Sequence, residues 1–308
     1  MIICNINDRE AEGNYTAPCI IALGNFDGVH VGHTALLCKT VELAGEYGVD
    51  PAVFTFAKHP ETVLKDRSVL SITTLNEKLE LFKQLGIQRV YLGDFERLRD
   101  YSPHRFVEEI IKGQANAVCA VCGYDFRFGS RGCGTPSDLA SLMDGNTVVI
   151  EPVMRRGQVV SSTSIREAIE NGDVEYAREL LDRPFFIEFP VVHGKKLGRT
   201  IGVPTINQNF PEGHVVPKRG VYACKVLTDS GEYIGVANVG IRPTVQDDKG
   251  LNCETHIIGF NGSLYGEKTK VSFYKRLRDE IKFESTDALK AQIEKDISNT
   301  TNYFNSGV

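Results

Sequence analysis

Residues 19–47 place an apolar run, a glycine-rich turn and an amphipathic segment in immediate succession. The run Cys19–Leu23 is short and uniformly apolar, which is typical of a buried strand in a parallel sheet. The turn Gly24–His33 reads GNFDGVHVGH and leads into Thr34–Tyr47, where apolar residues recur at helical spacing. This order of strand, tight turn and helix predicts half of a βαβ unit, and it restricts the fold more than any other stretch.

The turn itself predicts a phosphate site. A helix N-terminus offers unpaired N–H groups and partial positive charge to an anion, and two imidazoles beside it add hydrogen-bond donors. A histidine near a helix start can also be an ordinary hydrogen-bonded polar residue, but here three glycines accompany the pair. We therefore expect nucleotide phosphates to bind at Gly24, Asn25, Phe26, Asp27, Gly28, His30 and His33.

The N-terminal half alternates strand-like and helix-like segments, which predicts a parallel sheet with helices on both faces. In such folds ligands bind at the carboxyl ends of the strands, near a switch in strand order. The expected strands are 20–23, 52–56, 89–92, 117–121 and 147–153, and the expected helices are 34–47, 74–85, 103–112 and 174–181.

After Pro184 the rhythm changes to short β-rich runs separated by Gly, Pro and Asn, which predicts a small antiparallel barrel. The expected strands are 185–192, 220–227, 233–239, 253–260 and 269–274, with a closing helix at 286–297. A chain of 308 residues exceeds the usual size of one core. We therefore expect an α/β fold with two domains, 1–183 and 184–308.

Charge and apolar content exclude several classes of function. Residues 1–183 carry a net charge of −7 and residues 184–308 a net charge of +2, so we expect no nucleic-acid partner. No apolar run reaches the roughly 20 residues that span a bilayer, and the N-terminus lacks a signal-peptide pattern. We expect a cytoplasmic protein without membrane contact. Its eight scattered cysteines are interpreted as reduced thiols, and the pair Cys119 and Cys122 as part of a buried strand rather than a redox or zinc motif.

Two further segments of the first half suit a nucleotide or a heterocycle. Ser164 and Glu167 have capping-box spacing, which predicts a helix starting at Ser164. A cap alone would explain them, but the nearby hydroxyls and a guanidinium also suit phosphate; the candidates are Ser162, Thr163 and Arg166. In the loop after the strand at 117–121, Asp125 and Phe126 suit a planar heterocycle, although a simple turn explains them equally well.

The second half contains a candidate metal site and a candidate base. Thr205 and Asn207 alternate in an extended segment and offer the oxygen atoms that Mg²⁺ accepts. Gly198 and Gly202 precede them and allow close approach of a backbone. Glu254 places a carboxylate in an otherwise apolar strand, which is costly unless the group is paired or used; an outward-facing strand residue is the alternative.

The N-terminal segments Gly24–His33, Thr55–Pro60, Gly123–Gly129 and Ser161–Arg166 resemble the FMN adenylyltransferase module of bacterial bifunctional riboflavin kinase/FAD synthetases, a member of the HxGH nucleotidyltransferases. The resemblance implies that His30 and His33 bind ATP phosphates and stabilise the charge of the transition state. It implies that Ser162, Thr163 and Arg166 hold the triphosphate from the other side. Asn25, Asp27 and Asp125 would shape the nucleotide or flavin pocket, together with Phe126.

Residues 184–304 resemble the riboflavin kinase module of the same family. The sequence Pro204–Asn207 stands in place of the family's Pro-Thr-Ala-Asn motif and keeps its Thr and Asn. The resemblance implies that Thr205 and Asn207 ligate Mg²⁺ and that Glu254 is the general base. It places Arg278 in a loop that covers the flavin.

Together the two resemblances imply that the kinase makes FMN and the adenylyltransferase consumes it. ATP would be the co-substrate, Mg²⁺ the cofactor, and riboflavin, FMN and FAD the substrates and products. Lys58 and Thr135 depart from common family versions beside the motifs. Retention of only one activity, or a non-catalytic flavin-binding regulator, are the alternatives, and the sequence leaves a homo-oligomer open.

Overall fold

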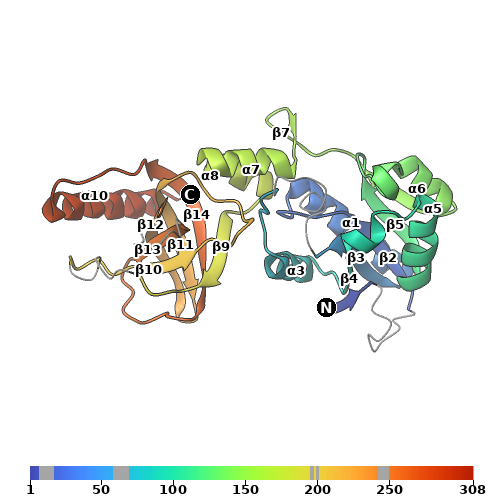
Figure 1. Ribbon diagram of the computed structural model, residues 1–308, viewed down its shortest axis with the longest axis horizontal. Helices are drawn as coiled ribbons and strands as arrows, with labels where there is room; N and C mark the ends of the chain where they lie inside the picture. Colours follow the sequence, from blue (N-terminus) through green and yellow to red (C-terminus); the bar gives the residue numbers. More distant parts are fainter. Residues whose placement is uncertain (7–16, 58–68, 195–197, 199–200, 242–249, 308) are drawn as a thin grey trace. The chain divides into compact units, whose positions relative to one another are not determined.

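The computed structural model describes residues 1–6, 17–57, 69–194, 198, 201–241 and 250–307 (Figure 1). Lys58 and the end of the predicted Thr55–Pro60 motif lie outside these residues. The chain forms two compact units, Met1–Ser162 and Thr163–Val308. Each is described on its own.

The first unit is built on a six-stranded sheet in which all neighbouring strands are parallel. The strand order β1-β4-β3-β2-β5-β6 reverses between β2 and β5, so the predicted turn after β2 lies at the switch point. The strands are β1 (Ile2–Asn5), β2 (Cys19–Leu23), β3 (Asp50–Phe56), β4 (Arg89–Gly93), β5 (Ala117–Gly123) and β6 (Thr147–Ile150).

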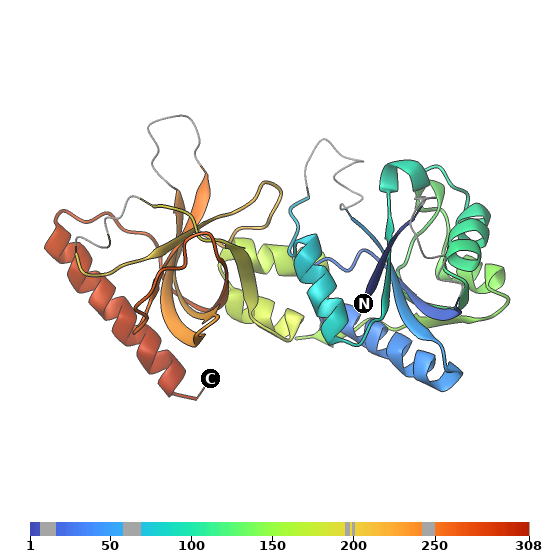
Figure 2. The ribbon, with the colours of Figure 1, turned by 90° about the horizontal axis from the view of Figure 1, so that it is seen from below.

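Alternate residues of β2 face opposite helical layers, as the two-residue period of a strand requires. Ile20 and Ala22 pack with residues of α1 and α3, whereas Ile21 and Leu23 pack with residues of η1 and α6. Figure 1 and Figure 2 show the helices on both faces of the sheet. The helices are α1 (Val31–Tyr47), α3 (Leu75–Gln84), α4 (Phe95–Leu98), α5 (Pro103–Arg105), the π-helix η1 (Phe106–Gln114), the 3₁₀-helix η2 (Ser130–Gly132) and α6 (Pro136–Leu142).

The sequence prediction differs from the first unit at several places. The helices α4, η2 and α6 were not predicted. β1 was not predicted, because four residues at a sheet edge give little periodic signal. The predicted helix at 103–112 is a short α5 followed by a nine-residue π-helix. The predicted strand at 147–153 stops at Ile150 and is followed by the hairpin of β7 (Met154–Arg155) and β8 (Gln158–Val159). The buried-strand interpretation of Cys119 and Cys122 is confirmed, because both lie buried in β5.

The second unit is the predicted antiparallel barrel with a C-terminal helix. Its sheet order is β10-β13-β12-β11-β14-β9, and the two edge strands meet: Gln208 Nε2 on β10 donates to the carbonyl of Phe189 on β9 at 2.7 Å. The strands are β9 (Phe185–Pro190), β10 (Ile206–Asn209), β11 (Gly220–Thr228), β12 (Gly231–Ile241), β13 (Leu251–Ile257) and β14 (Lys268–Arg278). The helices are α7 (Ser162–Asn171), α8 (Val174–Leu181) and α10 (Thr286–Asn305).

Two local features of this unit differ from the sequence prediction. The helix α7 begins at Ser162 and not at Ser164, so Ser164 lies inside the first turn and is not its cap. β10 was not predicted, since its sequence INQN is polar and short. Figure 2 shows α10 lying along the barrel, against β11 and β12.

Candidate active sites

The turn after β2 is held in an unusual backbone conformation. Phe26 and Val29 have φ angles of 54° and 41°, and Gly28 between them has a φ of 79°. Non-glycine residues, and β-branched ones above all, rarely adopt positive φ, and they keep it only where the surroundings fix it. Phe26 is fully buried, with its ring edge-on to Phe82 at 5.5 Å and to His33 at 5.2 Å between centroids.

The turn brings His30 and His33 together at the start of α1, as predicted. His30 is the N-cap, and its Nδ1 accepts a hydrogen bond from the backbone N–H of His33 at 3.3 Å. The proton of neutral His30 is therefore on Nε2. The two rings stack with centroids 3.6 Å apart. A Cβ at Gly32 would lie 3.2 Å from the His30 ring, so the glycine makes room for this pair.

Asp27 points into the protein and binds backbone groups there. The residue is 5% exposed, and its carboxylate accepts hydrogen bonds from the backbone of Ile72 at 2.9 Å and of Thr73 at 3.2 Å. The Thr73 hydroxyl in turn accepts from the Gly28 N–H at 3.1 Å. Asp27 and Gly28 therefore shape the turn.

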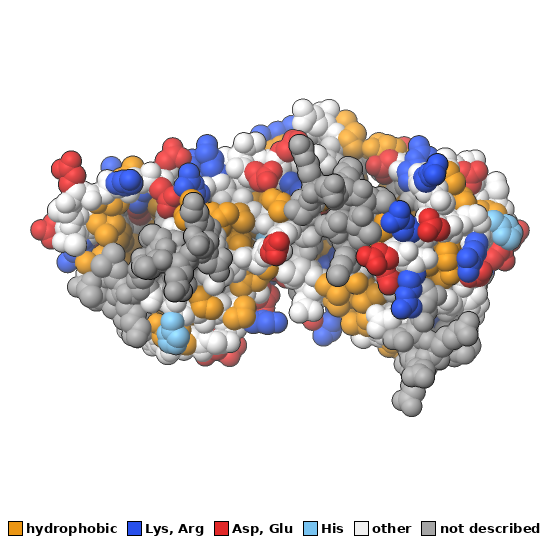
Figure 3. All heavy atoms as spheres, viewed as in Figure 1, with side chains coloured by type: hydrophobic (Ala, Val, Ile, Leu, Met, Phe, Trp, Pro, Cys, Tyr) orange, Lys and Arg blue, Asp and Glu red, His pale blue; other side chains and the backbone are white. Residues whose placement is uncertain are grey.

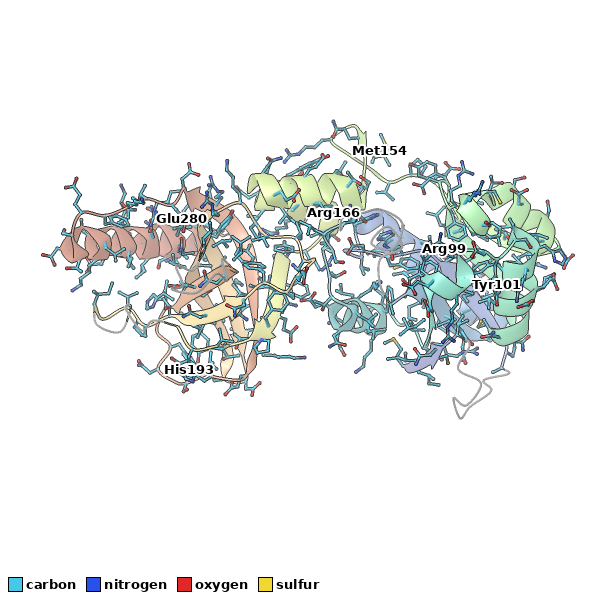
Figure 4. All side chains as sticks on the ribbon, viewed as in Figure 1. Arg99, Tyr101, Met154, Arg166, His193 and Glu280 are labelled. Atoms are coloured by element: carbon cyan, nitrogen blue, oxygen red, sulfur yellow. The ribbon has the colours of Figure 1, made fainter. Side chains whose placement is uncertain are left out.

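The predicted hydroxyl segment reaches the turn through its first residue. Ser162 Oγ donates to the Asp27 carbonyl at 2.9 Å, within the first unit. Thr163 and Arg166 follow on α7 and belong to the second unit by their contacts. Figure 4 labels Arg166 on this helix.

A cavity of about 600 Å³ opens beside the turn. Gly24, Asn25 and Phe126 line it, as expected for a flavin or nucleotide site, but Asp125 is exposed and is not part of the wall. Thr135, the departure from the family pattern, caps α6 and forms a capping box with Asp138. The other wall residues are Phe54, Phe56, Phe95, Leu98, Arg99, Asp100, Phe106, Arg127, Phe128, Gly129, Ser130, Arg131 and Gly132.

Sequence reasoning missed most of this wall. The rings of Phe126 and Phe128 stack at 5.6 Å, and Arg99, labelled in Figure 4, adds a guanidinium at the end of α4. Two of these residues could have been predicted from their place in the sheet. Phe54 and Phe56 lie at the carboxyl end of β3, beside the strand that carries the turn. An aromatic cavity with guanidinium groups suits a planar ring that bears a phosphate.

The second unit contains a separate cavity of about 260 Å³. Of the predicted residues, Gly198, Thr205, Glu254 and Arg278 line it, whereas Gly202 and Asn207 do not. The other wall residues are Ile201, Val203, Val221, Val236, Asn238, His256, Glu280, Ile281, Phe283, Leu289, Ile293 and Asp296.

Glu254 lies on β13 directly opposite Asn207 of β10. Asn252 Nδ2 lies 3.3 Å from Glu254 Oε1 and 3.5 Å from Asn207 Oδ1, so one amide connects the candidate base and the candidate metal ligand. Thr205 precedes β10 and faces the cavity. The pairing of β10 with β13 therefore brings together residues that are about 50 positions apart.

Gly198 is needed for close packing in this site. Its carbonyl accepts from the Val203 N–H at 2.8 Å, and a Cβ at Gly198 would lie 2.3 Å from the Val203 carbonyl. Gly202 has a φ of 81° and a Cβ there would meet nothing. The absence of a side chain at Gly198 thus permits its close approach to Val203, just before Thr205.

Arg278 is held by a carboxylate of α10. Its Nε lies 3.0 Å from Asp296 Oδ2 and its Nη2 lies 2.7 Å from the same atom. Asp296 is 2% exposed and also accepts from Gln292 at 2.9 Å. Because Asp296, Leu289 and Ile293 form one wall of the cavity, this ion pair fixes the helix that encloses the site.

Neither site holds a ready-made cage for a metal. In the described part of the chain, no group of three or more His, Cys, Asp or Glu side chains could bind an ion. Thr205 and Asn207 supply neutral oxygens only. Mg²⁺ commonly keeps several waters and binds through one or two protein groups and substrate phosphates, so these residues suit an ion that arrives with a nucleotide.

Two family models match the chain. Residues 13–164 match the model described as FAD synthetase, and residues 181–304 match the model described as riboflavin kinase. The bifunctional riboflavin kinase/FMN adenylyltransferase of Listeria monocytogenes is 36% identical over 92% of this chain and 92% of its own length. That of Bacillus subtilis is 38% identical over 94% of each.

The chain belongs to the bifunctional riboflavin kinase/FMN adenylyltransferase family. A solved structure from Streptococcus pneumoniae, described as a macrolide-efflux protein, is 33% identical and covers 98% of this chain and 99% of its own with a TM-score of 0.89. Among the residues that the structure describes, no helix is both long and apolar enough to cross a membrane. The FAD synthetase match contains the histidine turn and its cavity, and the riboflavin kinase match contains the barrel cavity.

Proposed function

We propose that the first unit transfers AMP from ATP to FMN and that the barrel unit transfers the γ-phosphate of ATP to riboflavin. One observation carries the proposal. Each of the two matched family regions has its own cavity, and each cavity adjoins the chemical groups that its reaction needs. The boundary between the functional domains is proposed at 183/184; residues 165–180 fall in neither family match.

In adenylyl transfer, an FMN phosphate oxygen attacks the α-phosphorus of ATP. A new P–O bond forms, the bond from the α-phosphorus to the bridging oxygen breaks, and pyrophosphate leaves. The nucleophile is already ionised, so the site needs positioning and charge stabilisation rather than a base. His30 and His33 supply donors at the positive end of α1, Ser162, Thr163 and Arg166 are proposed to bind the triphosphate, and the aromatic wall with Phe126 is proposed to hold the flavin.

In the kinase reaction, the terminal ribityl hydroxyl of riboflavin attacks the γ-phosphorus of ATP and ADP leaves. An alcohol is a weak nucleophile at neutral pH, so a positioned base helps. Glu254 lines the cavity and is proposed to take the hydroxyl proton. Gly198 and Gly202 are proposed to let the loop before Thr205 approach the phosphates closely, and Arg278 borders the flavin end of the cavity.

Magnesium is proposed at Thr205 and Asn207, where it would neutralise charge on the ATP phosphates. Their hydroxyl and amide oxygens fit this ion, and Asn252 fixes the orientation of the Asn207 amide. We also propose that Mg²⁺ accompanies the ATP triphosphate in the first unit, where it would neutralise phosphate charge in the same way.

Only small molecules are proposed as partners. Acidic and basic side chains are intermixed over the described parts of the face in Figure 3, and the first half of the chain has a net charge of −7; neither feature suits a polyanion. A cytoplasmic location, where ATP is available, is part of the proposal.

The proposal is tested by incubating the pure chain with riboflavin, ATP and Mg²⁺ and separating the flavins. We expect FMN first and FAD later, with one ADP released for each FMN made and one pyrophosphate for each FAD. Accumulation of FMN alone would favour a chain that keeps one activity, and tight flavin binding without turnover would favour a regulator. Either result would refute the proposal.

A further inference from the structure

Lys78 is a buried lysine beside the histidine turn, and no motif contains it. It lies on α3 and is 6% exposed. Its sequence position carries a signal, because it is three residues after Leu75 and four before Phe82 on the apolar face of the helix. A lysine is almost never buried this deeply unless its ammonium is fully hydrogen-bonded.

The ammonium bridges the turn and the end of β3. Lys78 Nζ donates to the Asn25 carbonyl at 3.0 Å, to Thr55 Oγ1 at 3.3 Å and to the Phe56 carbonyl at 3.3 Å. The Thr55 hydroxyl is itself committed, because it donates to the Asn25 carbonyl at 3.0 Å. Three acceptors match the three N–H groups of an ammonium.

These contacts act where the backbone is least relaxed. Asn25 directly precedes Phe26, which has a positive φ, and Val29, three residues further on, has one too. Such conformations cost about 1–3 kcal/mol each and persist when neighbours fix them. Asp27 fixes one side of the turn through Ile72 and Thr73, and Lys78 fixes the other through Asn25.

We propose that Lys78 is a positioning residue for adenylyl transfer: its ammonium fixes the Asn25 carbonyl to the end of β3 and thereby holds the turn in the conformation that presents His30 and His33. This inference rests on the proposed function of the first unit. The inference goes beyond that function, because it makes a residue outside every motif responsible for the conformation of the histidine turn.

The protonation state of Lys78 is part of this role. A neutral amine has only two N–H groups, so one of the three acceptors would lose its hydrogen bond. The nitrogen lone pair would then face either a carbonyl oxygen or the Thr55 hydroxyl, whose proton is already donated to Asn25. Burial lowers the pKa of Lys78 to about 8, while the charge of Asp27 raises it. Among the other charged groups of the packed elements, Glu77 of α3 is bound to the Thr74 N–H, and Asp50 of β3 pairs with Arg89.

Stability and activity should respond to pH in opposite directions at this group. The folded pKa of about 8 lies below the ordinary value of 10.5, so between these values the unfolded chain binds more protons. The contribution of Lys78 to the free energy of unfolding therefore rises with pH over that window. Deprotonation of Lys78 therefore does not unfold the chain. A loss of adenylyl transfer above pH 8 would instead report a change in the conformation of the turn.

The test compares K78M with K83M in the full chain, since Lys83 is an exposed lysine of the same helix. We expect K78M to lower kcat for FAD formation by about 100-fold, the scale of a misplacement near 1 Å. The KM for ATP and the riboflavin kinase activity should stay near wild type, and K83M should match wild type throughout. In the wild type, the ratio of FAD formation to kinase activity should fall above about pH 8, without loss of folded protein.

Equal kcat in wild type and K78M would overturn the role of Lys78 alone, whereas a wild-type chain that forms no FAD would overturn the proposed function as well. Should K78M fail to fold, T55V decides in its place. This variant removes one acceptor of Lys78 and one donor to Asn25, and it should lower kcat by about tenfold with an unchanged kinase rate. A T55V variant with wild-type kcat, or a wild-type ratio that is flat from pH 7 to 10, would refute the proposal.

Discussion

Replacing Arg278 by Met should destabilise the barrel unit more than it disturbs any ligand. The resemblance to the kinase family assigns Arg278 to the flavin, but the structure commits its guanidinium to Asp296 through three hydrogen bonds. The Asp296 side chain is 3% exposed and that of Arg278 is 21% exposed. Removing Arg278 therefore leaves a buried carboxylate without its partner.

The expected cost of R278M is about 3–5 kcal/mol, the range for one partner lost from a buried pair. D296L should cost less, about 1–3 kcal/mol, because the freed guanidinium keeps its bond to the Asp279 carbonyl and can turn to water. The double variant R278M/D296L removes both charges and leaves no buried ion. Its loss of unfolding free energy should therefore be smaller, by about 1–3 kcal/mol, than the sum of the losses in the two single variants.

Urea unfolding followed by circular dichroism gives these free energies, and the two enzymatic activities report each unit separately. Riboflavin phosphorylation should disappear at lower urea in R278M, while FAD formation from supplied FMN keeps its wild-type midpoint. K225M is the matched control: Lys225 pairs with the exposed Glu232 in the same barrel, and its loss should cost at most about 1 kcal/mol. An R278M variant as stable as K225M but without kinase activity would show that Arg278 serves the substrate and not α10.

Two further variants and one labelling experiment test the geometry of the histidine turn and the burial of β5. G32A should lower kcat for FAD formation by about tenfold or more, because a Cβ 3.2 Å from the His30 ring must displace it; G45A, where a Cβ meets nothing, should be at least as stable as wild type. Equal FAD formation in both would contradict the His30 geometry. At pH 8 a thiol reagent should label exposed Cys38 quickly and Cys122 only on unfolding. Burial raises the pKa of Cys122 from 9.0 to about 12, so its stabilising contribution is complete below pH 9 and is lost as the pH rises toward 12; rapid labelling of Cys122 in the folded chain would refute this.

The features that sequence predicted well are local ones. The Cys19–Leu23 strand, the glycine turn and the helix that follows are specified by adjacent residues, and the structure places His30 at the cap of that helix. The longer barrel strands were predictable because they are rich in apolar residues and separated by turn residues, whereas the short polar strand β10 was missed. The two family models confirm the predicted fold and family.

The features that sequence missed depend on partners far apart in the chain. Nothing in the neighbourhood of Asp27 indicates that its carboxylate is used by Ile72 and Thr73, 45 and 46 residues away. Likewise, Arg278 looked available for a ligand because its partner lies 18 residues further on. A polar residue in a motif suggests ligand contact, whereas tertiary hydrogen bonds decide whether its side chain is free to make that contact.

One chain that performs two successive reactions at two independent sites should allow variants of the two sites to complement each other. E254Q should convert supplied FMN to FAD but leave riboflavin unphosphorylated, and H30A/H33A should convert riboflavin to FMN and stop there. Mixed in one tube with riboflavin, ATP and Mg²⁺, the two variants should produce FAD. FAD from riboflavin in either variant alone, or no FAD in the mixture while each variant keeps its remaining activity, would contradict two independent sites.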